Sequence, residues 1–588
     1  MLLNYCVVVF FLLLIMFFPG ILIIRYLKNF NLLNKVILTV SVSLSFWICF
    51  AWFIFMLKLP LDLSAIVLLF IFSITSLVLY RQHIKSFRFS SFFSKFKRAH
   101  LVYVILLIAV VLYLFPLTFM AIPPGGDASM HGYITRLLIE NNGIPSTYDP
   151  IIPNQYFGSY SAGYHTLTAL VCAVNDHFLR EGINLITLSV YAFGLLSFVF
   201  LYSQFISVSS AVLCGVIIFS INNTLQPTIG WGGNPTILAF GLCLVSIGLL
   251  VNAIKNSNRF IFLITAIIIS AIPLTHAIPA IIFIYLSIPG FFLIVFFNRD
   301  KWKWILINSS IMAIISIALL LPFLAHFKNE NYSELSEMIK NWQIQMMGNN
   351  HADTLSGNLV IVFEQIKYRI GDPFLIISTL SLLGLFYFKK FKEISLVIFF
   401  FAYISLLILN CYYWVLPLSE LLYPERTVFF VIPCLGFLFG ILIDNMTKKE
   451  KLFVNLKYLL ISIFMMVGCV RYWNGYFLYL IEKNNLVCDK KTMEAFDWIK
   501  SNTATDALLK CTYMDIGMWI PAFSDRATIG AHFHFIHIVN HARELLEKSD
   551  KQKYYFVSMK DLAEKTEITK EISDKKIVFS NERVSIYH

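Results

Sequence analysis

The sequence predicts a polytopic α-helical membrane protein with about 13–14 transmembrane helices and a small C-terminal extracytoplasmic α/β domain. Of its 588 residues, 58% are hydrophobic and only 14% are charged, and the mean hydropathy is +0.74. So little charge cannot cover the surface of a soluble protein of this size. The hydrophobic runs end near Asn485, where the composition becomes that of a soluble domain. We therefore expect a membrane domain at 1–484 and a soluble domain at 485–588.

Basic residues between the apolar runs predict the orientation of the membrane domain. The first run has no basic n-region and no small-residue cleavage site, so we expect it to remain as a span. If each later run crosses once, the short basic clusters share one face, which the positive-inside rule makes cytoplasmic. This count requires that one apolar run between 162 and 254 does not span. We expect this of 162–178, because it carries His165, Asn175, Asp176 and His177.

The net charge of +12 does not indicate a nucleic-acid-binding protein. The tail from Asn485 holds 15 basic and 15 acidic residues, so the whole positive excess lies in the hydrophobic part of the chain. There it indicates which loops face the cytoplasm. The opposite face then receives the tail and the segments 122–160, 224–234, 326–372 and 411–426. Long loops gathered on one face commonly carry function. The length of 326–372 fits a mobile cover over a site.

The first of these loops contains the sequence Gly125-Gly126-Asp127. Asp127 stands where the N-cap of a helix is expected, and an apolar stripe from 128 to 141 predicts an amphipathic helix on the membrane surface. His131 follows Asp127 by one turn. Asp127 is then either a simple cap, or it acts with His131 as a base and its partner, or the two bind a metal ion.

Further polar residues and helix breakers fall at the same predicted ends of spans. They are His165 after an aromatic stretch, the sequence 231–235 with two glycines, and His276 ahead of Pro279. Arg426 directly precedes an apolar span. It is either a snorkelling anchor or a ligand for a lipid phosphate, since a guanidinium offers phosphate a bidentate fork.

The soluble tail reads as alternating helix and strand segments, with an amphipathic helix at 492–502 and a strand at 507–511. It is large enough to hold its own core. Its two cysteines, Cys488 and Cys511, could form a disulfide in an oxidising compartment, and the sequence leaves this open.

Together these stretches resemble the GT-C superfamily of integral-membrane glycosyltransferases, which includes oligosaccharyltransferase catalytic subunits and protein O-mannosyltransferases. The resemblance rests on short sequences that follow one another along the chain. In the membrane domain these are Gly-Gly-Asp127 and Tyr-Pro-Glu425-Arg426, and in the C-terminal tail they are Phe496-Asp-Trp498-Ile and the stretch 519–526. It implies transfer of a sugar from a polyprenyl-phosphate-linked donor to a glycan, lipid or protein acceptor on the extracytoplasmic face. Asp127 would then be the catalytic acid of the first loop, and the other site residues would bind substrate, namely His131, His165, His276, Glu425, Arg426 and Arg136.

Two matters stay open at this stage. The loop lacks an Asp-X-Asp sequence, so metal use is undecided, and Asp127 with His131 is the pair that would bind a divalent ion such as Mg or Mn. The alternative function is a transporter or flippase for a lipid-linked saccharide. The polar residues collect at one face and no internal repeat is evident, which favours the glycosyltransferase.

Overall fold

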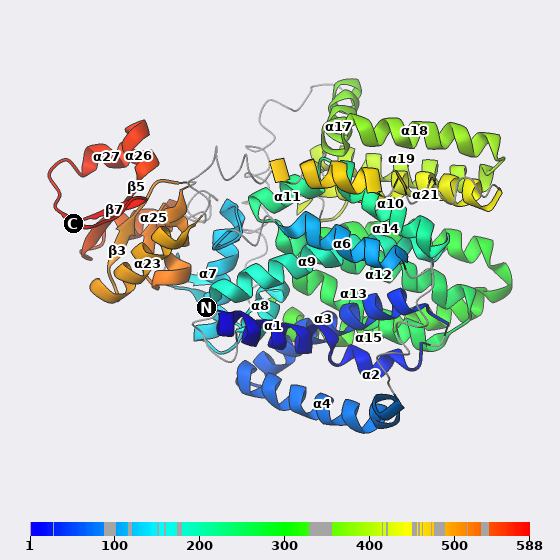
Figure 1. Ribbon diagram of the computed structural model, residues 1–588, viewed down its shortest axis with the longest axis horizontal. Helices are drawn as coiled ribbons and strands as arrows, with labels where there is room; N and C mark the ends of the chain where they lie inside the picture. The colour runs from blue at the N-terminus through cyan, green and yellow to red at the C-terminus, as the bar shows by residue number, and fades with distance from the viewer. Residues whose placement is uncertain are drawn as a thin grey trace.

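The computed structural model describes residues 2–588 except for residues 28, 87–100, 116–119, 150–151, 158–159, 173–178, 328–354, 414, 419–420, 450–455, 457–458, 461, 472, 475–487, 514 and 531–539. A bundle of long helices forms most of the molecule, and a small domain containing a β-sheet lies at one end of it (Figure 1).

The bundle is an integral-membrane domain. In the described part of the chain, nine helical segments are long and apolar enough to cross a bilayer. They are built from α1 (Leu2–Phe17) with α2 (Gly20–Ile24), α3 (Leu32–Met56), α4 (Leu61–Ser86), α9 (Leu179–Ser203), α12 (Asn234–Lys255), α14 (Ala277–Phe297), α15 (Trp302–Phe327), α19 (Phe391–Tyr413), and α20 (Pro424–Thr427) with α21 (Val431–Lys449).

Other apolar helices lie in the same bundle. The pair α17 (Leu355–Ile370) and α18 (Asp372–Tyr387) is bent by 101° at Gly371 and gives a tenth candidate span if both parts cross together. Four shorter apolar helices are α6 (Leu101–Leu114), α10 (Val208–Ile221), α13 (Arg259–Thr275) and the segment Ser462–Arg471. The polytopic fold is confirmed, and the total of 13–14 crossings stays a prediction.

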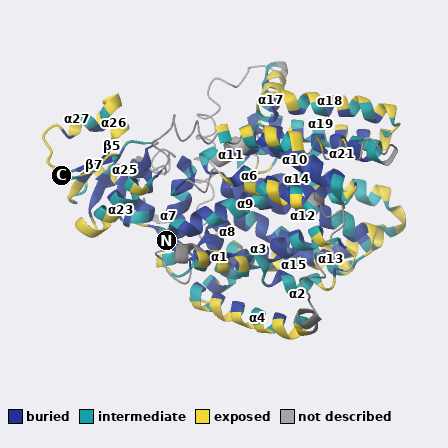
Figure 2. Ribbon diagram, viewed as in Figure 1, coloured by how far each residue is buried: buried dark blue, intermediate teal, exposed yellow. Residues whose placement is uncertain are grey.

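Burial separates inner helices from outer ones. Figure 2 shows α3, α9 and α12 mostly buried, whereas α4, α15 and α18 carry exposed residues along their length. The exposed side chains include large apolar ones such as Phe70, Ile314 and Leu380. In a bilayer such side chains contact hydrocarbon, so the outer helices form the lipid-facing layer.

The described part of the segment that we expected not to span is α8 (Gly163–Val171), a buried helix of nine residues. At about 1.5 Å per residue it covers less than half of a hydrocarbon core of about 30 Å, so α8 by itself is too short to cross. Residues 173–178 lie outside the described residues, and the prediction for 162–178 as a whole stays a prediction.

The C-terminal domain has the predicted α/β fold. Its five-stranded sheet has the order β4-β3-β5-β7-β6, with β3 parallel to β4 and β5, and β7 antiparallel to β5 and β6. The elements are α23 (Lys490–Asn502), β3 (Leu508–Lys510), η7 (Ile516–Trp519), α24 (Ile520–Ser524), β4 (Ala527–Ile529), α25 (Asn540–Glu547), β5 (Lys553–Ser558), α26 (Met559–Glu564), α27 (Glu567–Glu571), β6 (Ile577–Ser580) and β7 (Val584–Tyr587). Cys488 and Cys511 are both buried and unpaired.

The C-terminal domain packs directly on α7 (Gly126–Glu140), the helix of the first loop. A Cβ atom at Gly132 would lie 2.5 Å from the Trp519 indole, so only glycine permits this contact. α7 was expected to lie on the membrane surface. Instead it lies between α8 and the C-terminal domain, because its apolar residues face protein on both sides.

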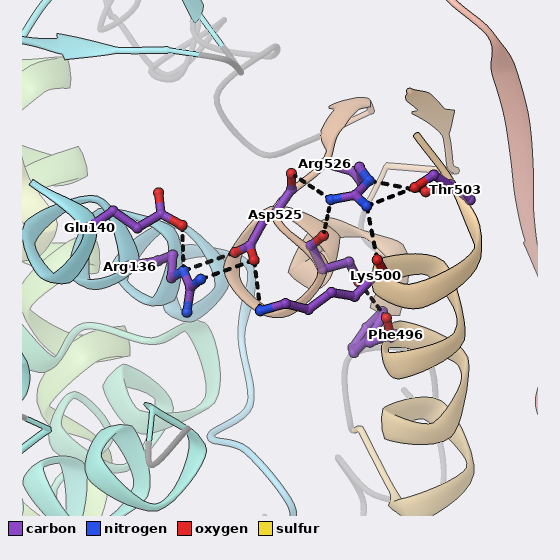
Figure 3. Close-up of polar contacts among 8 residues, drawn as sticks. Arg136, Glu140, Phe496, Lys500, Thr503, Asp525 and Arg526 are labelled. Carbon is purple, nitrogen blue, oxygen red and sulfur yellow. Dashed lines mark hydrogen bonds and ion pairs between the residues drawn. The ribbon is translucent and has the colours of Figure 1, made fainter. Parts of the chain in front are cut away.

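An ionic cluster ties the two domains together at the end of α7. Arg136 lies 2.8 Å from an oxygen of Asp525, and Lys500 of α23 lies 2.8 Å from the other. Figure 3 shows Arg136 pointing at Asp525 from one side and Lys500 from the other. The next residue, Arg526, is buried and donates to the carbonyl oxygens of Lys500 and Thr503, which satisfies the C-terminal end of α23.

Two buried carboxyl groups lie side by side in the C-terminal domain, on Asp515 and Asp561. Asp561 accepts hydrogen bonds from Ser558 and Thr566. Asp515 accepts one from the backbone of Ile516, and its second oxygen has no partner in the described part of the chain. Burial and the neighbouring carboxyl group raise the pKa of Asp515 well above its ordinary value.

We expect Asp515→Asn to stabilise the protein increasingly as the pH rises. The pKa of Asp515 is higher in the folded state than in the unfolded state, where it is about 3.9. Asp515 therefore makes its full contribution to the free energy of unfolding below about pH 3.9, and this contribution is lost as the pH rises through the folded-state pKa. Asparagine has no proton to lose, so the difference in stability should grow by up to about 1.4 kcal/mol per pH unit in that range. Thermal unfolding of the full-length protein from pH 5 to 9 measures it. A difference independent of pH would contradict the prediction.

Candidate active site

Two glycine-containing loops meet at the end of the bundle that faces the C-terminal domain. Gly125 has a φ of +112° and Gly232 a φ of +94°, a region that favours glycine. A Cβ atom at Gly125 would lie 2.3 Å from the Trp231 backbone, and one at Gly232 would lie 2.4 Å from the Ala128 nitrogen. The loops that precede α7 and α12 are therefore in backbone contact, which places Asp127 close to Trp231.

Asp127 is not the N-cap of α7, contrary to the expectation. The helix begins at Gly126, its N-cap is Gly125, and no side chain caps it. Asp127 instead lies in the first turn, where the helix dipole favours a carboxylate. The prediction failed because Gly125, a glycine with positive φ, begins the helix two residues earlier than the sequence pattern suggests.

His131 and His165 form a buried pair beside Asp127. His131 lies one turn after Asp127 on α7, and its Nδ1 is 3.0 Å from Nε2 of His165 on α8. The rings of Tyr160 and Tyr164 pack on His165 at centroid distances of 5.3 and 5.4 Å. Burial lowers the pKa of His165 well below its ordinary value, and the neighbouring His131 adds to this. His165 is therefore neutral and can take part in a hydrogen bond without bringing charge into the site.

His276 lies between α13 and α14 and has a structural role as the N-cap of α14. Its Nδ1 accepts a hydrogen bond from the Ile278 backbone at 3.3 Å. Burial, together with the charge of Arg426, lowers the pKa of His276 to about 3. The electrostatic effects of Arg426, His131 and Asp127 on this ring show that all three lie around it. His276 is also neutral.

Arg426 stacks on the tryptophan of the second glycine loop. Its guanidinium carbon lies 3.7 Å from the Trp231 ring centroid. Asp127, Glu425 and Arg369 are its charged electrostatic neighbours. Glu425 forms an ion pair of 2.8 Å with Arg369 at the end of α17. The arrangement thus holds two guanidinium groups and two carboxylates close together.

Three tyrosines complete the surroundings of Asp127. Burial and the charge of Asp127 raise the pKa of Tyr160 and of Tyr513, and burial raises the pKa of Tyr423 to about 12. All three phenols are therefore protonated hydrogen-bond donors. Tyr513 belongs to the C-terminal domain, so both domains contribute to the site.

Arg136 lies elsewhere than we expected. Its guanidinium binds Glu140 at 2.7 Å and Asp525 at 2.8 Å in the contact between the domains. Both partners are carboxylates, so Arg136 is engaged in the contact between the domains (Figure 3). The structure thus brings together Asp127, His131, His165, His276, Glu425 and Arg426, and it places Arg136 in the domain contact.

The sequence did not indicate Arg369 or Tyr513, and it indicated 231–235 only as a helix break, without a role for the Trp231 side chain. Arg369 falls in 326–372, which was expected to be a loop, yet 355–370 is the helix α17 and residues 328–354 lie outside the described residues. The helix break at Gly371-Asp372 was the available signal, because it ends α17 beside Arg369.

A divalent ion remains a prediction for Asp127 and His131. Within the residues that the structure describes, no group of three or more His, Cys, Asp or Glu side chains is arranged to hold a metal ion. Nδ1 of His131 is engaged with His165. We assign no chemical step to a metal.

The fold is that of GT-C glycosyltransferases. Oligosaccharyltransferase from Archaeoglobus fulgidus in its apo form is similar at a TM-score of 0.51 and 13% identity, over 80% of this chain and 70% of its own. ArnT from Cupriavidus metallidurans bound to undecaprenyl phosphate is similar at a TM-score of 0.52 and 12% identity, over 84% of this chain and 98% of its own. At these identities the similarity establishes the fold.

The chain belongs to the family of unknown function DUF6541, which matches residues 13–423. That range contains the first loop and α17, and it ends just before Glu425 and Arg426. No curated protein matches the chain.

Proposed function

We propose that this protein is a membrane glycosyltransferase that moves a sugar from a polyprenyl-phosphate-linked donor to a glycan, lipid or protein acceptor on the extracytoplasmic face. The observation that carries this proposal is the contact of the two glycine loops, which brings the Asp127 carboxylate within electrostatic reach of the Arg426 guanidinium. A base and a phosphate-binding cation are the two groups that such a transfer requires.

The proposed reaction is a displacement at the anomeric carbon of the sugar. Asp127 takes the proton of the acceptor hydroxyl as its oxygen bonds to that carbon. The bond from carbon to the donor phosphate oxygen breaks, and its electron pair leaves with polyprenyl phosphate. Arg426 stabilises the charge that grows on the leaving phosphate. The phenols of Tyr160, Tyr423 and Tyr513 are placed to hold sugar hydroxyls or the phosphate.

A lipid-linked donor fits the position of the site at the end of an apolar bundle. The polyprenyl chain would lie along the exposed apolar side chains of the outer helices, while its phosphate reaches Arg426. The similarity to ArnT, whose structure contains undecaprenyl phosphate, supports this class of donor. The basic clusters of the sequence support the extracytoplasmic side.

Transfer of label from polyprenyl-phosphate sugars by the purified full-length protein tests the proposal. We expect labelled product to form in detergent or nanodiscs, and formation to require the lipid-linked donor. Movement of a lipid-linked saccharide across a sealed vesicle without any transfer would instead identify a transporter or flippase and refute the proposal.

Arg426→Ala is expected to raise the donor KM about 10–100-fold, which corresponds to loss of about 1.4–2.8 kcal/mol from a charged phosphate contact. Steady-state kinetics with varied donor measure it. Arg299→Ala is the matched control, because Arg299 also lies over an aromatic ring, at 4.5 Å from Phe296, but beyond the other end of α14. An unchanged donor KM would show that Arg426 does not bind the donor phosphate and serves only as a membrane anchor.

A further inference from the structure

Arg369 gives the site a second guanidinium group beside Arg426, and Glu425 binds it. One Nη atom of Arg369 lies 2.8 Å from Oε1 of Glu425, while its buried Nε has no hydrogen-bond partner among the described residues. In contrast, no described carboxylate forms an ion pair with Arg426, which rests on the Trp231 ring. Glu425 thus reduces the positive charge of this region, whereas Arg426, its neighbour in the sequence, adds to it.

Hydrogen bonds fix the end of α17 that carries Arg369. The Thr224 hydroxyl donates to the Arg369 carbonyl at 2.6 Å, and the Asn223 backbone donates to the Ile370 carbonyl at 3.4 Å. Gly371 has a φ of +87°, and a Cβ atom there would lie 2.8 Å from the Asn223 side chain. Arg369 therefore occupies a built position next to Glu425, not a flexible surface position.

The charged groups of the site balance one another. Arg369 and Arg426 contribute two positive charges, and Glu425 and Asp127 contribute two negative charges. The nearby Lys367 is exposed and lies 4.0 Å from exposed Asp372, which adds no net charge.

His165 and His276 add no positive charge either, since burial lowers the pKa of both. When a site has no surplus positive charge, binding an anion with one negative charge costs less free energy than binding an anion with two or more. The difference is larger where water is partly excluded. A sugar joined to a polyprenol through one phosphate is a phosphodiester with a single negative charge. A diphosphate-linked sugar carries at least two.

We infer that Glu425 is a specificity-determining residue that restricts the donor to monophosphate-linked polyprenyl sugars. This inference rests on the proposed function and narrows its substrate class. By neutralising Arg369, Glu425 leaves Arg426 as the one guanidinium of the pair available to the donor phosphate. Replacing Glu425 by glutamine keeps its size and hydrogen-bonding capacity but frees the charge of Arg369 for a second phosphate.

The test compares binding of the methyl esters of undecaprenyl phosphate and undecaprenyl diphosphate, which carry one and two negative charges as the sugar-linked lipids do. Binding to the full-length protein in detergent is measured by displacement of a fluorescent polyprenyl phosphate. We expect the wild type to bind the monophosphate about tenfold or more tightly than the diphosphate, a preference of one unit in log Kd. In Glu425→Gln the preference should fall below about threefold, mainly because diphosphate binding improves.

Glu140→Gln is the matched control. Glu140 also pairs with an arginine, Arg136, at 2.7 Å, and its side chain is as exposed as that of Glu425, 42% against 46%. We expect it to leave the preference unchanged. Equal weakening of both lipids in Glu425→Gln would show that Glu425 only holds Arg369 in place, and it would overturn the inference while leaving the proposed function intact. Failure of either lipid to bind the wild type would count against the proposed function itself.

Discussion

Asparagine in place of Asp127 is expected to lower kcat about 10²–10⁴-fold, the usual contribution of a general base. The amide cannot accept the acceptor proton, but it has the same size and stays in the first turn of α7. Because the N-cap of α7 is Gly125 and not Asp127, the substitution leaves the capping residue unchanged, and the fold should remain intact. Transfer kinetics, with thermal unfolding of the same samples, measure both effects.

The pattern of the kinetic effect separates a base from a binding residue. We expect the donor KM of Asp127→Asn to change by less than about threefold, since the donor phosphate is held by Arg426. Asp149→Asn is the control within the same loop, because the exposed Asp149 side chain bonds to Thr147 at 2.7 Å and lies outside the site. Full transfer by a folded Asp127→Asn protein would refute the assignment of Asp127 as the base.

The sequence was sufficient to predict the membrane fold, the α/β tail and the end of the bundle where the polar loops gather. Each of these depends on local composition or on alternation of spans, which a single sequence displays. The loops around Asp127, Trp231 and His276 all carry glycine or proline at the end of a span, so their common location followed from topology. Their catalytic and binding roles stay predictions.

The contacts within the site could not be predicted in the same way. Arg369 is one of 46 basic residues, and nothing in the sequence distinguishes it from the exposed Lys367 one half-turn earlier. Tertiary structure also determines that Arg136 lies in the contact between the domains and Arg426 in the site. Arg136 meets Asp525 only because the C-terminal domain packs on α7, a contact between residues 389 positions apart.

The same packing makes Trp519 the residue through which the C-terminal domain acts on α7. Trp519 is fully buried, it lies against Gly132, and its ring is 5.6 Å from that of Phe523. Gly132 is in the turn that follows His131, so the indole supports the helix next to the His131–His165 pair. Loss of the indole should therefore affect the site as well as stability.

We expect Trp519→Ala to destabilise the contact between the domains by about 3–5 kcal/mol, because it leaves a large cavity that α7 and α24 cannot fill. Transfer activity should fall with it, since α7 no longer holds Asp127 beside Arg426. Hydrogen exchange of the full-length protein measures the effect, with faster exchange expected in both α7 and η7. Gly132→Val should give the same result from the other side of the contact, because its Cβ would overlap the indole.

Trp498→Ala provides the matched control for this prediction. Trp498 lies on α23 of the same domain and packs on Phe579 of β6, with ring centroids 5.4 Å apart. Its loss should destabilise the C-terminal domain but leave exchange in α7 unchanged. If Trp498→Ala and Trp519→Ala accelerated exchange in α7 equally, the effect would be general unfolding of the domain. Support of α7 by Trp519 requires that only Trp519→Ala and Gly132→Val change the helix that carries Asp127.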